Sequence, residues 1–222
     1  MAKILNVAGL VVGLSALVVQ FALSIPASME AGRSLAGSVV HYFSYFTILT
    51  NILVVLVHLA VLLGAPRFFT QAWVRAGVAV AILFVSLVYW QLLSAIWQPE
   101  GLFLGCDVAL HYVAPALYLI WWLIAGTDGS LSWRHLPLWL AYPLIYAAYA
   151  LVRAPIAGEV PYYFLDARLN GWPSVLVYLA AMSLTFVFLG RLAMLADRII
   201  AGGKPARKGD AIAPNQNSVV KP

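Results

Sequence analysis

The stretch YFSYFTILTNILVVLVH, residues 42–58, has the length and apolar character of a membrane helix but carries many polar side chains. Its polar members are Ser44, Thr47, Thr50, Asn51 and His58. Inside hydrocarbon, a polar side chain without a hydrogen-bond partner is costly, so it is kept where it faces other helices or a water-filled cavity. The stretch therefore predicts an all-α membrane protein with a polar interior.

The composition of the whole chain agrees with this interpretation. Hydrophobic residues make up 64% of the 222 residues, charged residues make up 9%, and the mean hydropathy is +0.92. A surface of this composition is solvated by lipid rather than by water. The single cysteine, Cys106, excludes an internal disulfide and a multi-cysteine metal site. The net charge of +5 is not concentrated on a folded basic surface, so nucleic acid is not an expected partner.

Apolar blocks separated by Gly, Pro and charged residues predict a polytopic protein with six transmembrane helices. The blocks are continuous and long, unlike the alternating strands of a membrane barrel. The first is expected to be a retained helix, because its apolar run exceeds that of a usual signal peptide. The predicted spans, within one domain of residues 1–197, are about residues 5–25, 41–63, 73–96, 106–125, 136–154 and 174–196.

The distribution of basic residues predicts the orientation of these spans. If the N-terminus is cytoplasmic, only Arg33, Arg153 and Arg168 of the 13 Lys and Arg residues fall outside. Basic residues favour the cytoplasmic side of a membrane, so both termini are expected there. Residues 198–222 are basic and rich in Pro and Gly, and we expect a disordered cytoplasmic tail.

The polar residues of the second span share one face. At about 100° per residue, Ser44, Asn51 and His58 fall within about 60° of Thr47, and Thr50 lies at the opposite edge. Three further spans carry polar and aromatic stripes of the same kind. These stripes predict an internal polar and aromatic cavity for substrate, with the following lining: Trp90, Ser94, Pro115, Tyr118, Tyr142, Tyr146, Tyr149 and Tyr163.

Thr47 and His111 are predicted to lie at matching depth. The second and fourth spans start from the same side of the membrane, near His41 and Cys106. A rise of about 1.5 Å per residue then places Thr47 about 9 Å and His111 about 7–8 Å below that surface. A neutral imidazole is the usual base that activates a hydroxyl nucleophile near neutral pH. The pair therefore indicates acyl transfer, with Asp107 one turn away to orient the imidazole.

The same residues also have simpler interpretations. A membrane threonine commonly bonds the carbonyl four residues earlier, and a buried histidine is commonly an interhelical hydrogen-bond partner. In the catalytic interpretation, Asn51 or Ser44 would donate a hydrogen bond to the oxyanion. No helix has two histidines on one face at a spacing suited to haem, and we expect neither a cofactor nor a metal.

Three short motifs occur in a distinctive order. They are YFTILTNIL at Tyr45–Leu53, LHYVAPALYL at Leu110–Leu119, and VPYYFLD at Val160–Asp166 followed by Gly171 and Trp172. In this order, and with six spans over about residues 1–197, the chain resembles the androgen-induced-gene family of six-helix membrane proteins. The bacterial branch of that family, the Pr-six-Pr membrane proteins, is the most similar.

This resemblance implies a specific activity. Animal members of the family are threonine hydrolases that cleave fatty acid esters of hydroxy fatty acids (FAHFAs) with an intramembrane threonine and histidine. The resemblance assigns these roles to Thr47, with Thr50 as the second choice, and to His111. It also implies a lipid or amphiphilic ester substrate and a bacterial plasma (inner) membrane location. The loop with Tyr163 and Asp166 is expected to cap the cavity, with Asp166 as a supporting residue.

Two other classes of function fit the predicted spans. One is a non-catalytic membrane protein that binds a lipid or a small hydrophobic molecule, in which polar stripes serve packing and specificity. The other is a transporter, which is the weaker alternative because the spans show no paired broken helices and no inverted repeat.

Overall fold

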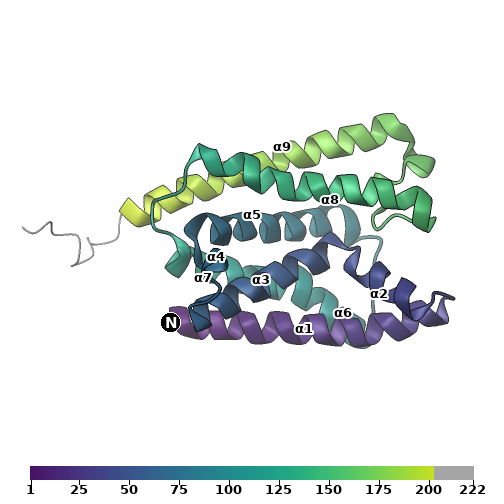
Figure 1. Cartoon of the computed structure of the whole chain (residues 1–222), viewed down its shortest axis with the longest axis horizontal. Coiled ribbons are helices and arrows are strands. Elements are labelled where there is room, and N and C mark those ends of the chain that lie inside the picture. Colours follow the sequence, from purple (N-terminus) through teal and green to yellow (C-terminus); the bar gives the residue numbers. More distant parts are fainter. Residues whose placement is uncertain (203–222) are drawn as a thin grey trace, which may run out of the picture.

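The computed structural model describes residues 1–202, and this part of the chain is helical without strands. Six helical spans are long and apolar enough to cross a membrane, and they run side by side in one bundle (Figure 1). The predicted all-α, six-span architecture is confirmed. The spans are Ala2–Glu30, Phe46–Leu63, Ala72–Leu93, Gly101–Gly126, Trp133–Ala157 and Ala167–Gly202.

Several spans combine more than one kind of helix. The third ends in a π-helical turn, the fourth contains two π-helical turns, and the last bends at Gly171, which has a φ of 72°. In chain order the segments are α1 (Ala2–Glu30), α2 (Leu35–Phe43), α3 (Phe46–Leu63), α4 (Arg67–Thr70), α5 (Ala72–Val88), η1 (Tyr89–Leu93), α6 (Gly101–Val108), η2 (Ala109–Val113), α7 (Ala114–Trp121), η3 (Trp122–Gly126), η4 (Trp133–His135), α8 (Leu136–Ala157), η5 (Tyr163–Leu165) and α9 (Ala167–Gly202).

Helix α5 lies at the centre of the bundle. It contacts α3 and α7 on one side and α8 and α9 on the other, and α1 covers α3 and α7 (Figure 1). Many of its residues are buried, including Ala76, Val80 and Ile82, because other helices surround it and its sequence is largely apolar. The outer helices bury one face each and leave the other for lipid.

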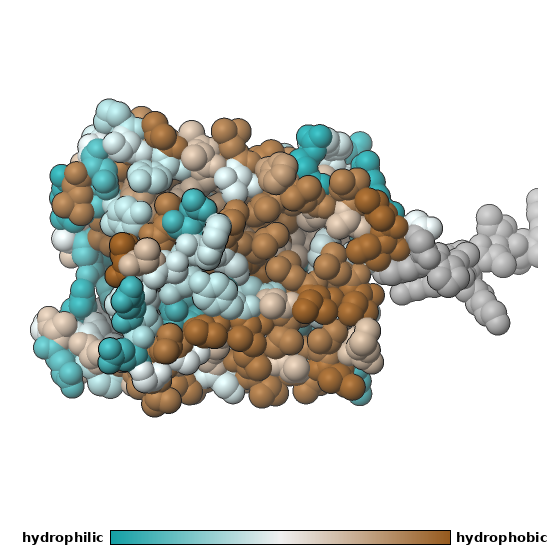
Figure 2. Space-filling view, turned by 180° about the vertical axis from the view of Figure 1, so that it is seen from behind, coloured by the Kyte–Doolittle hydropathy of each residue, from teal (hydrophilic) through white to brown (hydrophobic). Residues whose placement is uncertain are grey.

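The two ends of the bundle differ. The N-terminus and the C-terminal end of α9 lie at one end, which we call the terminal end (Figure 1). Helix α2 and the loops of residues 94–100 and 158–166 lie at the other, which we call the cavity end. Seen from behind, pale and teal residues gather around a hollow at the cavity end, while brown residues cover much of the remaining face (Figure 2).

The predicted second span, residues 41–63, is not one helix. Helix α2 ends at Phe43, and α3 begins at Phe46 after an extended Tyr45. The Ser44 hydroxyl donates to the His41 carbonyl at 2.6 Å, which satisfies the last turn of α2 and lets the chain change direction. As a result, Thr47 lies in the first turn of α3 rather than in the middle of a longer helix.

The terminal end is closed by Asp197 of α9. Its carboxylate accepts hydrogen bonds from the backbone N–H groups of Asp128, Gly129 and Leu131, which ties the loop between the fourth and fifth spans to α9. Helix α9 continues to Gly202, so residues 198–202 of the predicted tail are helical. The rest of the predicted tail, residues 203–222, lies outside the described residues.

Candidate functional site

The side chains of Thr47 and His111 meet at the cavity end. The Thr47 Oγ1 atom lies 3.3 Å from His111 Nε2, within hydrogen-bond distance. Thr47 is 9% exposed and the His111 side chain 12% exposed, so both are largely shielded but still reach a cavity. The structure thus brings together the hydroxyl and the imidazole that the sequence placed at matching depth.

The other nitrogen of His111 faces Asp107. His111 Nδ1 lies 3.0 Å from the Asp107 carbonyl oxygen and 3.2 Å from its carboxylate oxygen Oδ1. Both are acceptors, so the ring proton belongs on Nδ1, and Nε2 presents its lone pair to Thr47. The Thr47 hydroxyl is then the donor and His111 the acceptor, which is the arrangement that general-base catalysis requires.

Tyr89 fixes this arrangement from the third span. Its ring stacks on His111 with centroids 3.7 Å apart and an interplanar angle of 15°. Its hydroxyl donates to Asp107 Oδ2 at 2.5 Å. One side chain therefore restrains both the plane of the imidazole and the carboxylate beside it.

Two π-helical turns position these residues. Tyr89 begins η1, and His111 lies in the middle of η2. A π-helical turn contains an extra residue, so it rotates the following side chains and leaves backbone carbonyls open to side-chain donors. The Leu110 carbonyl accepts from Asn51 Nδ2 at 3.1 Å, and the His111 carbonyl accepts from the Ser86 hydroxyl at 2.7 Å.

The N-terminus of α3 presents backbone N–H groups beside the Thr47 hydroxyl. Helix α3 begins at Phe46, so the N–H of Thr47 has no acceptor within the helix. It points at the hydroxyl oxygen of Tyr162, 3.4 Å away, in the loop before α9. Burial raises the pKa of Tyr162, so the phenol keeps its proton and remains a donor. Donors and the positive end of a helix dipole thus surround the Thr47 hydroxyl.

A cavity of about 720 Å³ opens onto Thr47 and His111. It lies between α1, α2, α6 and the loop that carries Tyr163, and its lining contains both apolar and polar side chains. Gln20 and Ser24 of α1 line it and share a hydrogen bond of 2.9 Å. A cavity of this size and mixed lining suits an amphiphilic molecule.

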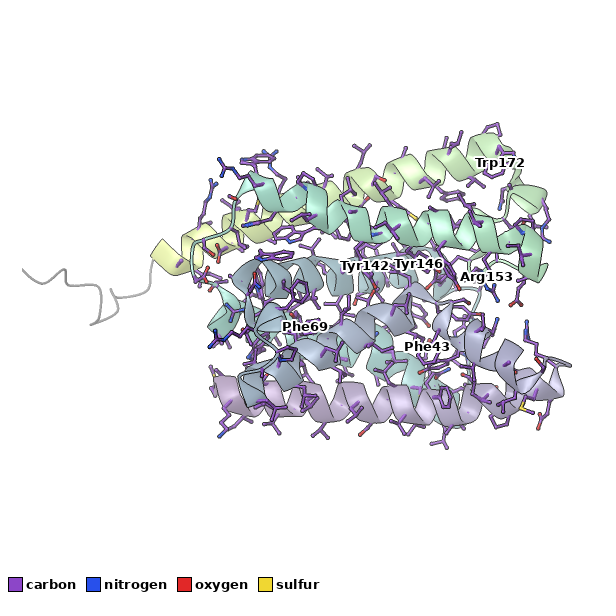
Figure 3. All side chains as sticks on the ribbon, in the orientation of Figure 1. Phe43, Phe69, Tyr142, Tyr146, Arg153 and Trp172 are labelled. Atoms are coloured by element: carbon purple, nitrogen blue, oxygen red, sulfur yellow. The ribbon has the colours of Figure 1, made fainter. Side chains whose placement is uncertain are left out.

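A smaller pocket of about 70 Å³ reaches Thr47 from the side of the bundle that faces α8 and α9. It lies between α5, α8 and α9, and its lining is almost entirely apolar. Tyr146 lines it, and its hydroxyl donates to the Ser44 carbonyl at 2.8 Å. Figure 3 shows Tyr142 and Tyr146 projecting from α8 toward α3.

The predicted oxyanion donors are used elsewhere. Asn51 Nδ2 donates to the carbonyls of Thr47 and Leu110, at 2.9 and 3.1 Å, so both of its protons are engaged. The Ser44 hydroxyl is also engaged, as described above. Asn51 and Ser44 therefore hold the backbone around the site, and they do not supply donors to a bound ester.

Asp166 does not reach the site. Its carboxylate accepts hydrogen bonds from the Arg168 guanidinium at 3.0 and 2.9 Å, and from the Arg168 backbone N–H at 2.9 Å. These bonds order the first turn of α9, which follows the loop of residues 158–166 at the cavity end. Asp166 is thus a structural residue of the loop.

The helical stripes predicted the cavity lining poorly. Tyr163 lines the large cavity and Tyr146 the small one. Tyr89, the first residue of η1, is buried against His111, whereas the neighbouring Trp90 is 63% exposed. The predicted residues that line neither cavity are Trp90, Ser94, Pro115, Tyr118, Tyr142 and Tyr149.

Thr50, the second choice for the nucleophile, has a different role. Its hydroxyl donates to the Phe46 carbonyl at 2.8 Å and lies 3.1 Å from the Tyr142 hydroxyl, and no imidazole within residues 1–202 bonds to it. Tyr89 was missed because its partners, His111 and Asp107, lie on another span, and the sequence pattern does not reveal which side chains meet across spans. Tyr162 was treated only as part of a capping loop, although the VPYYFLD motif contains it.

Within residues 1–202, no three His, Cys, Asp or Glu side chains are grouped to hold a metal ion. Comparisons of the chain with protein-family models, with curated proteins and with solved structures give no match. The functional interpretation therefore depends on the geometry of the site and on the sequence motifs.

Proposed function

We propose that this protein is an intramembrane hydrolase of lipid esters, with Thr47 as nucleophile and His111 as general base. The observation that supports it most strongly is the 3.3 Å contact between Thr47 Oγ1 and His111 Nε2 at the wall of a large cavity. Catalytic hydrogen bonds are often long before substrate binds, so a direct contact of this length fits a poised pair.

In the first step, Thr47 Oγ1 attacks the carbonyl carbon of the ester while its proton moves to His111 Nε2. The resulting imidazolium is stabilised by Asp107, which accepts the hydrogen bond from Nδ1. The negative charge appears on the former carbonyl oxygen. The Tyr162 hydroxyl and the positive end of the α3 dipole are the groups available to stabilise it, and the Thr47 N–H joins them by exchanging its bond to the Tyr162 oxygen for one to the substrate.

The intermediate then collapses, and the alcohol leaves with the proton held by His111. Thr47 is left as an acyl ester. In the second half, His111 takes a proton from water, the hydroxide equivalent attacks the acyl carbon, and the proton returns to Thr47 Oγ1. The products are an alcohol and a carboxylic acid, and the enzyme is regenerated without a cofactor.

The cavities and the motifs support a substrate class. The small apolar pocket between α5, α8 and α9 suits a short apolar group, and the larger mixed cavity suits the remainder of an amphiphilic molecule. The resemblance of YFTILTNIL and LHYVAPALYL to the FAHFA hydrolases supports an ester of a hydroxy fatty acid. Membrane lipids are the surrounding solvent and the source of such a molecule.

We further propose that the chain resides in a bacterial plasma membrane with both termini in the cytoplasm. The excess of Lys and Arg at the terminal end supports this orientation. The Thr47 site then lies in the outer half of the bilayer, where an amphiphilic ester can present its polar end toward the aqueous phase.

The decisive experiment measures ester hydrolysis by the purified protein in detergent. Branched fatty acid esters and p-nitrophenyl esters are offered to the wild type, Thr47→Val and His111→Ala. We expect kcat/KM to fall by about a thousandfold in both variants, because each removes one half of the nucleophile–base pair.

Thr50→Val is the matched control, because it removes the same hydroxyl one turn further along α3. Its activity should remain within about threefold of the wild type. If hydrolysis survives in both Thr47→Val and His111→Ala, the catalytic assignment is wrong. Ligand binding without hydrolysis in the wild type would support the alternative, a non-catalytic protein that binds a lipid or a small hydrophobic molecule.

A further inference from the structure

A charged cluster lies at the exposed end of the large cavity. Glu159, in the loop after α8, is bonded to three basic side chains: Arg33, Arg153 and His41. The Arg153 and His41 contacts are both 2.8 Å. Burial alone would raise the pKa of Glu159, but the bonds from Arg153, Arg33 and His41 outweigh it and lower the pKa to about 2. The carboxylate is therefore ionised at any working pH.

The cluster has more positive charge than its internal pairing needs. One carboxylate faces two guanidinium groups, so at least one positive charge is not neutralised within the cluster even with a neutral His41. The Nη1 atom of Arg153 is buried and has no hydrogen-bond partner among the described residues. Figure 3 shows Arg153 at the cavity end of α8. Buried cationic donors of this kind favour an anionic partner.

The cluster belongs to the same cavity as the proposed nucleophile. Arg33 and His41 line that cavity together with Thr47 and His111. His41 Nε2 lies 3.3 Å from the Tyr45 hydroxyl, and the Tyr45 ring packs against Tyr162 with centroids 5.9 Å apart. Tyr162 in turn contacts the N–H of Thr47. An unbroken row of side chains thus joins the charged end of the cavity to the site of ester cleavage.

We propose that Arg33 and His41, which line the cavity, bind a free carboxylate of the ester substrate while the ester bond lies at Thr47, and that Arg153, paired with Glu159, adds positive charge beside them. This inference rests on the proposed function and adds a specificity determinant to it. The substrate is then an ester that carries a second, ionised acid group on the same molecule, and neutral esters are poorer substrates. Glu159 holds the basic side chains in place and competes with the substrate for them.

A purely structural role for the cluster makes a different prediction. If Glu159 and its partners only tie the loop to α2 and α8, removing either sign of charge should weaken ligand binding alike. If the cluster recognises an anion, removing Arg33 weakens binding of the acid, whereas removing the competing Glu159 strengthens it. The two variants therefore move the affinity in opposite directions.

The experiment uses a branched ether analogue, in which an ether replaces the ester, with a free carboxylate at one end. Its methyl ester and its phosphate counterpart complete the set. Binding is measured at pH 7.5 in detergent by the change in tryptophan fluorescence, because Trp97 lines the cavity. We expect the acid to bind roughly tenfold more tightly than the methyl ester, the effect of one charge-assisted hydrogen bond.

Arg33→Gln should remove most of this preference, and Glu159→Gln should increase it. Arg168→Gln is the matched control, because that guanidinium pairs with Asp166 and does not line the cavity. Equal affinity of the wild type for the acid and its methyl ester would overturn the proposal, as would a Glu159→Gln variant that loses the acid preference. Tighter binding of the phosphate analogue would assign the cluster to a phospholipid headgroup and overturn the carboxylate.

The analogue cannot be cleaved, so this result is separate from the test of catalysis. Thr47→Val should keep the preference for the acid even though it abolishes hydrolysis. If Arg33→Gln does not fold, the wild type and Glu159→Gln still decide the outcome. If the protein prefers the acid but hydrolyses no ester, the proposed anion site is supported and the proposed hydrolase function is wrong.

Discussion

His111 and His58 are both held in spanning helices, yet their ring nitrogens meet different partners. His111 presents Nε2 to the Thr47 hydroxyl and reaches the large cavity. His58 is 0% exposed, and its Nδ1 lies 2.5 Å from the Asn6 amide oxygen. Asn6 Nδ2 also donates to the His58 carbonyl at 3.1 Å, so the two side chains form a closed pair between α1 and α3.

The surroundings of His58 leave no room for a substrate. The rings of Tyr118 and Trp121 lie 5.1 Å from it, centroid to centroid, and Gly9 of α1 packs directly against its other edge. The comparison shows that an intramembrane imidazole is suited to catalysis when it has an orienting acceptor, a hydroxyl and access to a cavity. An imidazole that has only an orienting acceptor, such as His58, serves to hold two helices together.

Exchanging each histidine for glutamine tests this difference most strongly. His111→Gln should reduce kcat/KM by about 10²–10⁴-fold, because it removes the general base. His58→Gln should leave kcat/KM per folded molecule within about twofold. It should instead lower the free energy of unfolding by about 1–3 kcal/mol through the disturbed pair with Asn6. Ester kinetics and thermal unfolding of both variants provide the measurements.

Loss of activity in both variants, with unfolding unchanged, would contradict the division between the two histidines. An inactive His111→Gln variant that is also strongly destabilised would leave the general-base role without support. Unfolding curves are therefore recorded on the same preparations as the kinetics.

Gly9→Ala perturbs the His58 region without touching Thr47. A Cβ atom at Gly9 would lie 2.3 Å from His58 Nε2, so the imidazole or α1 must shift. Overpacking of this kind should destabilise the protein by about 1–3 kcal/mol. Activity per folded molecule should be unchanged.

Gly105→Ala in α6 is the matched control. A Cβ atom there meets nothing within 4 Å, so the substitution should be neutral or slightly stabilising, as expected for alanine in a helix. Equal destabilisation by the two substitutions would show that the contact between Gly9 and His58 is not tight.

Tyr89→Phe tests how the His111 region is oriented. The ring still stacks on His111, but the hydrogen bond to Asp107 is lost. Because Tyr89 acts through Asp107, we expect kcat to fall by about tenfold with little change in KM. Tyr112→Phe is the control, since Tyr112 packs edge-on against Tyr89 but lies in the lipid-facing half of η2 and is 40% exposed. Equal effects of the two substitutions would argue against a positioning role.

The smallest effect concerns Glu159 in acid. Its pKa is lowered from 4.5 to about 2 in the folded protein, so it stabilises the fold at pH values above 4.5. This contribution is lost as the pH falls from 4.5 to 2, and it should amount to about 1 kcal/mol after screening by solvent. Unfolding measured over this range should show a weaker pH dependence in Glu159→Gln. An identical dependence in both proteins would contradict the bonding of Glu159 to its basic partners.

The sequence predicted the spans well because their signal is local. Long apolar blocks in a 222-residue chain have few structural solutions in lipid, and all six appear as helices. The break between α2 and α3 was missed, since Ser44 and Tyr45 are compatible with a continuing helix. The bond of the Ser44 hydroxyl to the His41 carbonyl, the contact of the Tyr45 hydroxyl with His41 Nε2 and the bond of Tyr146 to the Ser44 carbonyl decide otherwise.

From the sequence, only the part of the site that depends on the depth of each residue in the membrane was predicted. Thr47 and His111 were paired from the helical rise, which tolerates small errors in helix boundaries. The cavity lining depended on which face of each helix meets its neighbours, and in the third span that face carries Tyr89 rather than Trp90. Asn51 was expected to have a free amide, but its Nδ2 donates to the carbonyls of Thr47 and Leu110, and a helical wheel does not show the contact with the other span.

Covalent trapping with a fluorophosphonate tests the central claim most directly. An activated hydroxyl displaces fluoride and forms an O–P bond, its proton passing to the base, and the adduct is located by peptide mass spectrometry. We predict one adduct, on Thr47, that is absent in Thr47→Val, strongly slowed in His111→Gln and unchanged in His58→Gln. An unmodified Thr47, or labelling of Thr47 at the same rate in His111→Gln, would contradict the account.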